Sequence, residues 1–141
     1  KEIWDSYILS AEVRNRKVFE YVKFEKYRKS LLTQFSDFQI IYEKKGVAVW
    51  GAGHQALAIL STFELGTWIK YVVDSAKFKQ HKFTPGSKLP IFPPEHLFKE
   101  KVSSLIIIGA GFSDEIARIV KEKKYPVQNI YILRESGLEA I

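Results

Sequence analysis

The sequence predicts an α/β protein with three layers, built on a parallel sheet of about four or five strands and preceded by a long N-terminal helix or helix pair. Short apolar runs alternate with helical segments, which is the pattern of a parallel sheet covered by helices on both faces. Two of these runs, 47–50 and 105–108, lead into Gly-Ala-Gly. A glycine pair after a buried strand lets the chain turn sharply into a helix.

The first segment, residues 1–45, is expected to be helical because it contains no Gly or Pro and its apolar residues recur at helical spacing. One long helix or two consecutive helices fit this pattern: Asp5 or Ser10 is a candidate for the start of the first, and Ser36 or Asp37 for a break between two. The end is placed at 44–46, since cations suit the negative pole of a helix and glycine its stop. Its aromatic surface is more than one helix can bury, so we expect a connector to another domain or a homodimer contact.

Residues 46–141 are expected to form the α/β domain, because strand and helix alternate from Gly46 onward. The expected strands are 47–50, 69–73, 105–108 and 129–133, and the expected helices are 54–64 and a second one capped by Ser113 or Asp114 and ending near 124. Pro94 is placed to open a short helix and Pro85-Gly86 to form a turn. Right-handed crossovers put the glycine-rich ends of the first and third strands at one edge of the sheet, where such folds bind ligands.

Composition narrows the class of protein. The chain has 141 residues and 46% apolar content, enough for one sizeable core with an appendage. It has no cysteine, which excludes disulfides and thiolate zinc sites, and no apolar run near the roughly 20 residues that span a bilayer. We therefore expect a cytoplasmic protein without a membrane segment. Because the chain begins at Lys1 and lacks methionine, we expect a piece of a longer protein.

Charge indicates the kind of ligand. The formal net charge is +6, and residues 70–101 hold seven Lys or Arg against three acidic residues. Such a local excess suits an anionic small molecule, or a solvated loop, better than a stripe that follows a nucleic acid duplex. Nucleic acid is therefore not the expected partner.

A dinucleotide-type fingerprint marks the candidate site. Gly51, Gly53 and Ala56 match G-x-G-x-x-A, and Asp74 follows Gly53 by 21 residues, about the interval at which a carboxylate reaches a ribose diol. Amides at the start of the following helix attract phosphate. The fold is therefore expected to be Rossmann-like, and the candidate ligand-binding residues are Gly51, Ala52, Gly53, His54, Gln55, Asp74, Lys79, Gly109, Gly111, Phe112 and Ser113. The alternative is that the glycines serve turn geometry alone.

Other chemistries find less support in the sequence. A domain that binds S-adenosylmethionine usually carries an acidic residue two positions before the first glycine, where this chain has Val49. His54, His81 and His96 are scattered without a carboxylate at ligand spacing, so no metal site is expected. No nucleophile, histidine and acid follow the order of a catalytic triad, so no catalytic residue is assigned.

The stretch after Asp74 carries a more specific pattern. It contains Asp74, Lys79-Gln80, Phe83-Thr84-Pro85-Gly86, Leu89-Pro90-Ile91 and Pro93-Pro94-Glu95-His96-Leu97, followed later by Phe112-Ser113-Asp114-Glu115-Ile116. This pattern resembles the C-terminal domain of the sugar C-methyltransferases, which add a methyl carbon to nucleotide-linked deoxysugars. The resemblance covers residues 46 to about 119. The chain departs from the family at 51–56, where the family's lysine is lost, at His81, which replaces a glycine, and at 109–111, which replaces Trp-Asn.

The resemblance implies a Rossmann-like domain that helps to enclose a nucleotide-sugar. An upstream domain is then expected to supply S-adenosylmethionine and the catalytic base, so the domain alone is expected to hold no cofactor and to be inactive. Two alternatives stay open. The fingerprint taken literally predicts an NAD-binding module, and the aromatic segment 1–45 predicts a protein-interaction or dimerisation domain.

Overall fold

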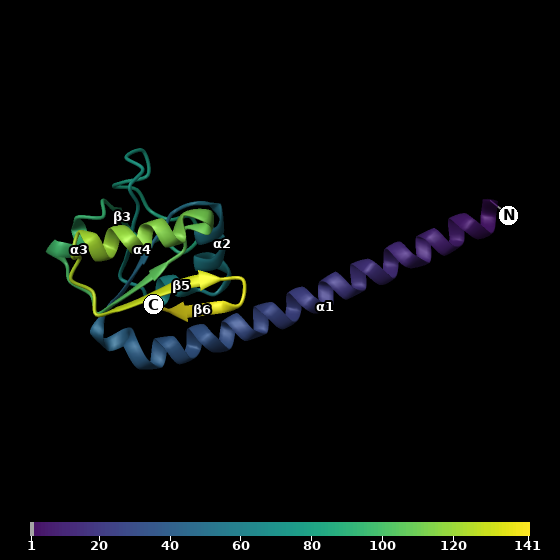
Figure 1. Ribbon diagram of the computed structural model, residues 1–141, viewed down its shortest axis with the longest axis horizontal. Coiled ribbons are helices and arrows are strands. Elements are labelled where there is room, and N and C mark those ends of the chain that lie inside the picture. The colour runs from purple at the N-terminus through teal and green to yellow at the C-terminus, as the bar shows by residue number, and fades with distance from the viewer. Residues whose placement is uncertain (1) are drawn as a thin grey trace. The chain divides into compact units, whose positions relative to one another are not determined.

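The computed structural model describes residues 2–141, with side chains described for residue 18 and for residues 20–141 (Figure 1). The contacts between residues group the chain into two compact units, of which one ends at Thr33 and the other spans Gln34–Ile141. Each unit is described by itself below.

The N-terminal helix is a single element. Helix α1 spans Glu2–Tyr42, so it begins before Asp5 and Ser10 and runs through Ser36 and Asp37 without the break that was allowed there. The expected stop is confirmed: a 3-10 turn, η1 (Glu43–Lys45), is followed by Gly46 at φ +84°, a conformation that favours glycine. The break is absent because Phe35 and Phe38, on either side of the pair, are buried in the core, and this packing outweighs the weak helix propensity of Ser and Asp.

Large apolar side chains are exposed along the described part of α1. They are Val18, Tyr21, Val22, Phe24, Leu32, Ile40 and Ile41. A contact of this helix with another domain or a second copy of the chain stays a prediction.

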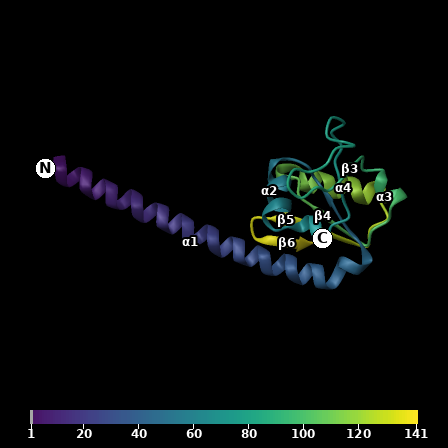
Figure 2. The same ribbon diagram turned by 180° about the vertical axis from the view of Figure 1, so that it is seen from behind.

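The α/β architecture is confirmed, with more strands than expected. The sheet has six strands, β1 (Val47–Trp50), β2 (Tyr71–Val73), β3 (Ile91–Phe92), β4 (Ser104–Ile107), β5 (Asn129–Arg134) and β6 (Gly137–Ala140). Their order is β3-β2-β1-β4-β5-β6; the first five are parallel to one another and β6 is antiparallel to β5. Figures 1 and 2 show β5 and β6 side by side from both directions. This is the Rossmann order, which reverses direction between β1 and β4.

Strands β3 and β6 were missed for local reasons. β3 contains only two residues and lies in a polar, proline-rich stretch, so it has no apolar run of its own. β6 pairs with β5 across a tight turn, and only Gly137 in it is buried. Short edge strands of this kind carry almost no periodic signal.

The helices of the α/β unit are α2 (His54–Thr62), α3 (His96–Lys99) and α4 (Ser113–Glu122), with 3-10 turns η2 (Leu65–Thr67) and η3 (Ala110–Phe112). Two details correct the expectations. Neither Ser113 nor Asp114 caps α4: the cap position is Phe112, and the Ser113 hydroxyl accepts the Gly109 N–H at 3.0 Å instead. The short helix near Pro94 exists, but it begins at His96.

Helices cover both faces of the sheet. On one face, α3 and α4 bury Leu97, Ala117 and Val120 against alternate residues of the strands, Ala48, Trp50, Tyr71, Val73, Leu105, Ile107 and Ile132. On the other face, the C-terminal part of α1 packs through two aromatic pairs, Phe35 against Phe63 at 5.3 Å and Phe38 edge-on to Tyr131 of β5 at 4.9 Å. The central strands are therefore buried on both sides, and the open part of the sheet is its carboxyl edge.

Candidate functional site

The two glycine-rich loops meet at the carboxyl edge of the sheet, as expected. β1 and β4 are direct neighbours, with Trp50 opposite Ile107, so the loops that follow them leave the sheet side by side. Gly51 donates its N–H to Val73 O at 2.9 Å and Ile108 donates to Trp50 O at 2.9 Å. Gly51 has φ +132°, and a Cβ there would lie 2.1 Å from Ile108 O. Only glycine fits this approach of two backbones.

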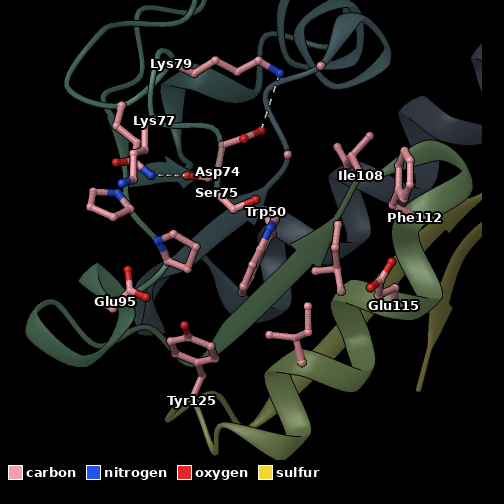
Figure 3. A pocket seen from close by; sticks show the side chains of 18 of the residues that line it. Trp50, Asp74, Ser75, Lys77, Lys79, Glu95, Ile108, Phe112, Glu115 and Tyr125 are labelled. Atoms are coloured by element: carbon pink, nitrogen blue, oxygen red, sulfur yellow. Dashed lines mark hydrogen bonds and ion pairs between the residues drawn. The ribbon is translucent and has the colours of Figure 1, made fainter.

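Asp74 binds the first glycine-rich loop directly. Its Oδ2 accepts the Ala52 N–H at 2.8 Å, and its Oδ1 accepts the Ala76 N–H at 2.8 Å. Lys79 Nζ lies 3.9 Å from the same Oδ2, and Gln80 Nε2 donates to Asp74 O at 2.9 Å. Figure 3 shows the Lys79 and Asp74 side chains directed toward one another.

The expected mechanism places the phosphate-attracting amides at the start of the helix that follows the loop. Within the loop itself, the Ala52 amide is engaged by the Asp74 carboxylate. The amides at the start of α2, at His54 and Gln55, lack partners within the helix because of their position in its first turn. The Ala52 amide is therefore not free for an anion, and phosphate binding at the first turn of α2 stays a prediction.

A pocket of about 750 Å³ opens at this edge, beside Asp74 and both glycine loops. Of the candidate residues, Gly51, Gly53, Asp74, Lys79, Gly109 and Phe112 line it, whereas Ala52, His54, Gln55, Gly111 and Ser113 do not. Ala52 and Ser113 are buried, and His54, Gln55 and Gly111 are exposed. Their roles in binding stay predictions.

Sequence reasoning missed the apolar wall of this pocket. It comprises Trp50, Pro93, Pro94, Ile108, Ile116, Ile119 and Tyr125. Trp50 could have been found, since it is the last strand residue before Gly51. Residues 112, 116, 119 and 123 share the spacing of one helix face, but nothing local shows that this face meets the pocket. Tyr125 lies far from the glycine loops in the sequence, and only the fold brings it to the pocket.

The electrostatic character of the pocket is mixed. Its lining holds Lys77, Lys79 and Lys123 and, against them, Asp74, Glu95 and Glu115, so its formal charges balance. The ring of Tyr125 stands edge-on to Trp50, with centroids 5.7 Å apart. Burial, with a smaller contribution from the Glu95 carboxylate, raises the pKa of the Tyr125 phenol, so it stays protonated and can donate a hydrogen bond at neutral pH.

Asp114, next to the pocket residue Glu115, has a different partner. Its carboxylate receives two hydrogen bonds from Arg134, at 2.6 and 3.1 Å. These bonds hold the pKa of the exposed Asp114 carboxyl below its usual range. Asp114 therefore lies outside the pocket and offers a control position for variants of Asp74.

No group of three or more His, Cys, Asp or Glu is arranged to hold a metal ion in the part of the chain with described side chains. Among the helices that the structure describes, none combines the length and apolar character needed to cross a bilayer.

Comparison with known proteins places the chain in a family. A search of curated proteins returned no match. Among solved structures, the crystal structure of UDP-D-quinovosamine 4-dehydrogenase from Vibrio fischeri is similar, with a TM-score of 0.51 and 16% identity, covering 69% of this chain and 93% of that one. At this identity the likeness shows the Rossmann-type fold alone. The family model described as the C-methyltransferase C-terminal domain matches residues 10–129, and the chain therefore belongs to the family of C-methyltransferase C-terminal domains.

Proposed function

We propose that this domain binds the nucleotide-sugar substrate of an S-adenosylmethionine-dependent sugar C-methyltransferase, while the methyl donor and the catalytic base reside in another domain. The observation that carries the proposal is the pocket at the switch point between β1 and β4, with the Asp74 carboxylate in its wall, in a chain of this family. Its volume of about 750 Å³ lies within the usual range of about 300–1,000 Å³ for small-molecule sites.

Asp74 retains acceptor capacity for sugar hydroxyls. Each carboxylate oxygen accepts one amide N–H, and an ionised carboxylate oxygen has room for a second hydrogen bond. The Asp74 side chain is 14% exposed, so the remaining acceptor positions are reachable from the pocket. Lys79, whose side chain is 28% exposed, brings a cation beside them that suits a phosphate.

The sequence gives S-adenosylmethionine less support as the ligand of this domain. The position two residues before Gly51 is usually acidic in domains that bind the donor, and here it is Val49, which is fully buried within β1. We therefore assign substrate binding to this domain, and methyl transfer requires the donor-binding domain.

Calorimetric titration of the domain with UDP- and TDP-linked hexoses tests this function. We expect saturable heat for at least one of them, and about tenfold weaker binding in Asp74→Asn, which loses the charge but keeps the shape. Asp114→Asn, outside the pocket, is the matched control and should bind like the wild type. Absence of heat with every nucleotide-sugar tested would contradict the proposal.

NAD binding is the second candidate. It is favoured by the placement of Gly51, Gly53 and Ala56 between β1 and α2, with Asp74 at the end of β2, which is the arrangement of dinucleotide-binding folds. A carboxylate at that position accepts the ribose 2′-hydroxyl and repels a 2′-phosphate, so NADH should bind at least about tenfold more tightly than NADPH. Fluorescence titration with both measures this. Saturable NADH binding with no response to nucleotide-sugars would replace the first proposal by the second.

A further inference from the structure

The loop between β2 and β3 is basic and carries aromatic side chains. Residues 75–90 contain four lysines, one histidine and two phenylalanines, and no Asp or Glu occurs between Asp74 and Glu95. In Figures 1 and 2, the loop beside β3 extends outward from the helices and strands of the α/β unit. We name residues 75–90 the basic finger.

The two phenylalanine rings of the basic finger are open to solvent. The exposed fraction is 72% for Phe78 and 69% for Phe83. Lys79 Nζ lies 5.6 Å from the centroid of the Phe78 ring, which leaves most of that ring in water. Two large rings exposed in one loop are an apolar surface that a partner can cover.

Hydrogen bonds hold the backbone of the basic finger, so the Phe83 ring cannot simply fold back onto the domain. The Ile91 N–H donates to Lys82 O at 2.8 Å, which ties the finger to β3. Thr84 is 1% exposed, and its Oγ1 accepts the Leu89 N–H at 2.9 Å. Phe83 therefore lies between two anchored positions and keeps its side chain exposed.

Three of the four lysines in the basic finger carry charges that no carboxylate neutralises. Lys79 lies 3.9 Å from Asp74. Lys77, Lys82 and Lys88 are exposed, and none of them pairs with a carboxylate in the part of the chain whose side chains are described. A partner that covers the finger must therefore be anionic and must also accept apolar rings.

An anionic lipid surface meets both demands. There a lysine ammonium stays at the level of the phosphates while a neighbouring ring enters the hydrocarbon. A protein partner fits less well, because lysine is depleted in protein interfaces, whereas here a lysine directly precedes each ring. A single-stranded nucleic acid binds in a basic groove, whereas the finger projects from the domain.

We propose that the basic finger docks the protein onto an anionic membrane surface, with its two phenylalanine rings among the lipids and its three unpaired lysines at the headgroup phosphates. Such binding at the surface requires no spanning helix. The inference goes beyond the proposed function and does not depend on it. Lys77 and Gln80 also line the pocket, so the docked protein holds its pocket close to the membrane.

Co-sedimentation of the chain with unilamellar vesicles tests the docking. Vesicles of phosphatidylcholine and phosphatidylglycerol in equal parts should bind the protein at least about tenfold more strongly than vesicles of phosphatidylcholine alone, since each lysine near an anionic surface contributes about fivefold. Added salt should weaken the binding, because it screens these charges. Absence of binding to the anionic vesicles, or equal binding to both kinds, would overturn the proposal.

Substitution of a ring separates insertion from adsorption by charge alone. Phe83→Ser should weaken binding to the anionic vesicles at least about fivefold, because burial of an aromatic side chain contributes roughly tenfold or more. Ile40→Ser is the matched control, since Ile40 is 82% exposed on α1 and lies outside the finger. Wild-type binding by Phe83→Ser, or an equal loss in Ile40→Ser, would overturn the proposal.

Substitution of a lysine tests the charge. Lys82→Glu should weaken binding at least about tenfold, because it removes a cation from the finger and adds an anion. Lys121→Glu makes the same change of net charge at an exposed position of α4 and should stay within about twofold of the wild type. Thermal unfolding checks that the variants are folded, as expected for exposed positions. Equal binding by the two lysine variants would contradict docking through the finger.

Titration with an oligouridylate examines the other anionic macromolecule. We expect no binding that Phe83→Ser or Lys82→Glu weakens. If the oligouridylate binds while the vesicles do not, and both substitutions weaken its binding, the finger is a surface for single-stranded nucleic acid and the membrane proposal is overturned.

Discussion

Gly51→Ala is expected to lower the free energy of unfolding of the α/β unit by about 3–5 kcal/mol, since backbone strain and overpacking each contribute about 1–3 kcal/mol. The new Cβ would lie 2.1 Å from Ile108 O and 3.0 Å from Ile108 C, and the residue has φ +132°. The obstructing atoms are backbone atoms at the end of β4, where the Ile108 N–H is bonded to Trp50 O, so they cannot move aside as a flexible side chain would. Urea unfolding followed by circular dichroism measures the change.

Gly111→Ala is the matched control for this variant. Gly111 belongs to the second glycine-rich loop, but a Cβ there meets nothing within 4 Å. Its φ lies outside the left-handed region, so an alanine adopts the same backbone without strain. We expect a change of no more than about 0.5 kcal/mol, as for other surface substitutions. Equal unfolding midpoints for Gly51→Ala and Gly111→Ala would refute the assignment of Gly51 to a required close approach.

Asp74→Ala is expected to destabilise the domain by about 2 kcal/mol, before any ligand is considered. The substitution removes the acceptor of two backbone N–H groups, at Ala52 and Ala76. Ala52 is 3% exposed, so its N–H would be left buried without a partner, and that loss dominates the cost. Ala76 is half-buried and can turn to water.

Comparison of three variants isolates this structural role. Asp74→Asn keeps an oxygen that accepts one of the two amides, so its unfolding midpoint should lie between those of the wild type and Asp74→Ala. Asp114→Ala removes an exposed carboxylate paired with Arg134 and should unfold close to the wild type. An Asp74→Ala variant as stable as the wild type would show that the carboxylate does not hold the loop. Ligand titrations are therefore interpretable with Asp74→Asn rather than Asp74→Ala.

The elements with a strong local signal were predictable. Four strands, the two glycine loops at one edge, and the helix stop before Gly46 follow from apolar runs and glycine positions, and the structure confirms them. The family resemblance, based on motifs between Asp74 and Ile116, is also confirmed. What failed were elements with weak local signals: the two-residue strand β3, the edge strand β6, and the cap of α4, where the Ser113 hydroxyl bonds Gly109 instead.

The sequence predicted the position of the candidate site and its carboxylate, but not the apolar side chains that line the pocket. The spacing from Gly53 to Asp74 placed the carboxylate beside the loop, because the strand, helix and strand between them have a nearly constant length. The same spacing could not show that the carboxylate accepts a hydrogen bond from the Ala52 N–H. It also could not show the apolar wall of the pocket, which includes residues 50, 93–94 and 116–125.

By itself, the sequence determined where the backbone is buried and where it turns, since apolar periodicity and glycine act through neighbours a few residues apart. It therefore determined the fold class, the edge at which ligands bind in such folds, and the family. The tertiary structure alone decided which hydrogen-bonding groups at that edge are already occupied and which side chains form the pocket wall. The physical reason is that a hydrogen bond or a stacked ring depends on distances of a few ångströms between segments far apart in the chain, and only the packed sheet sets those distances.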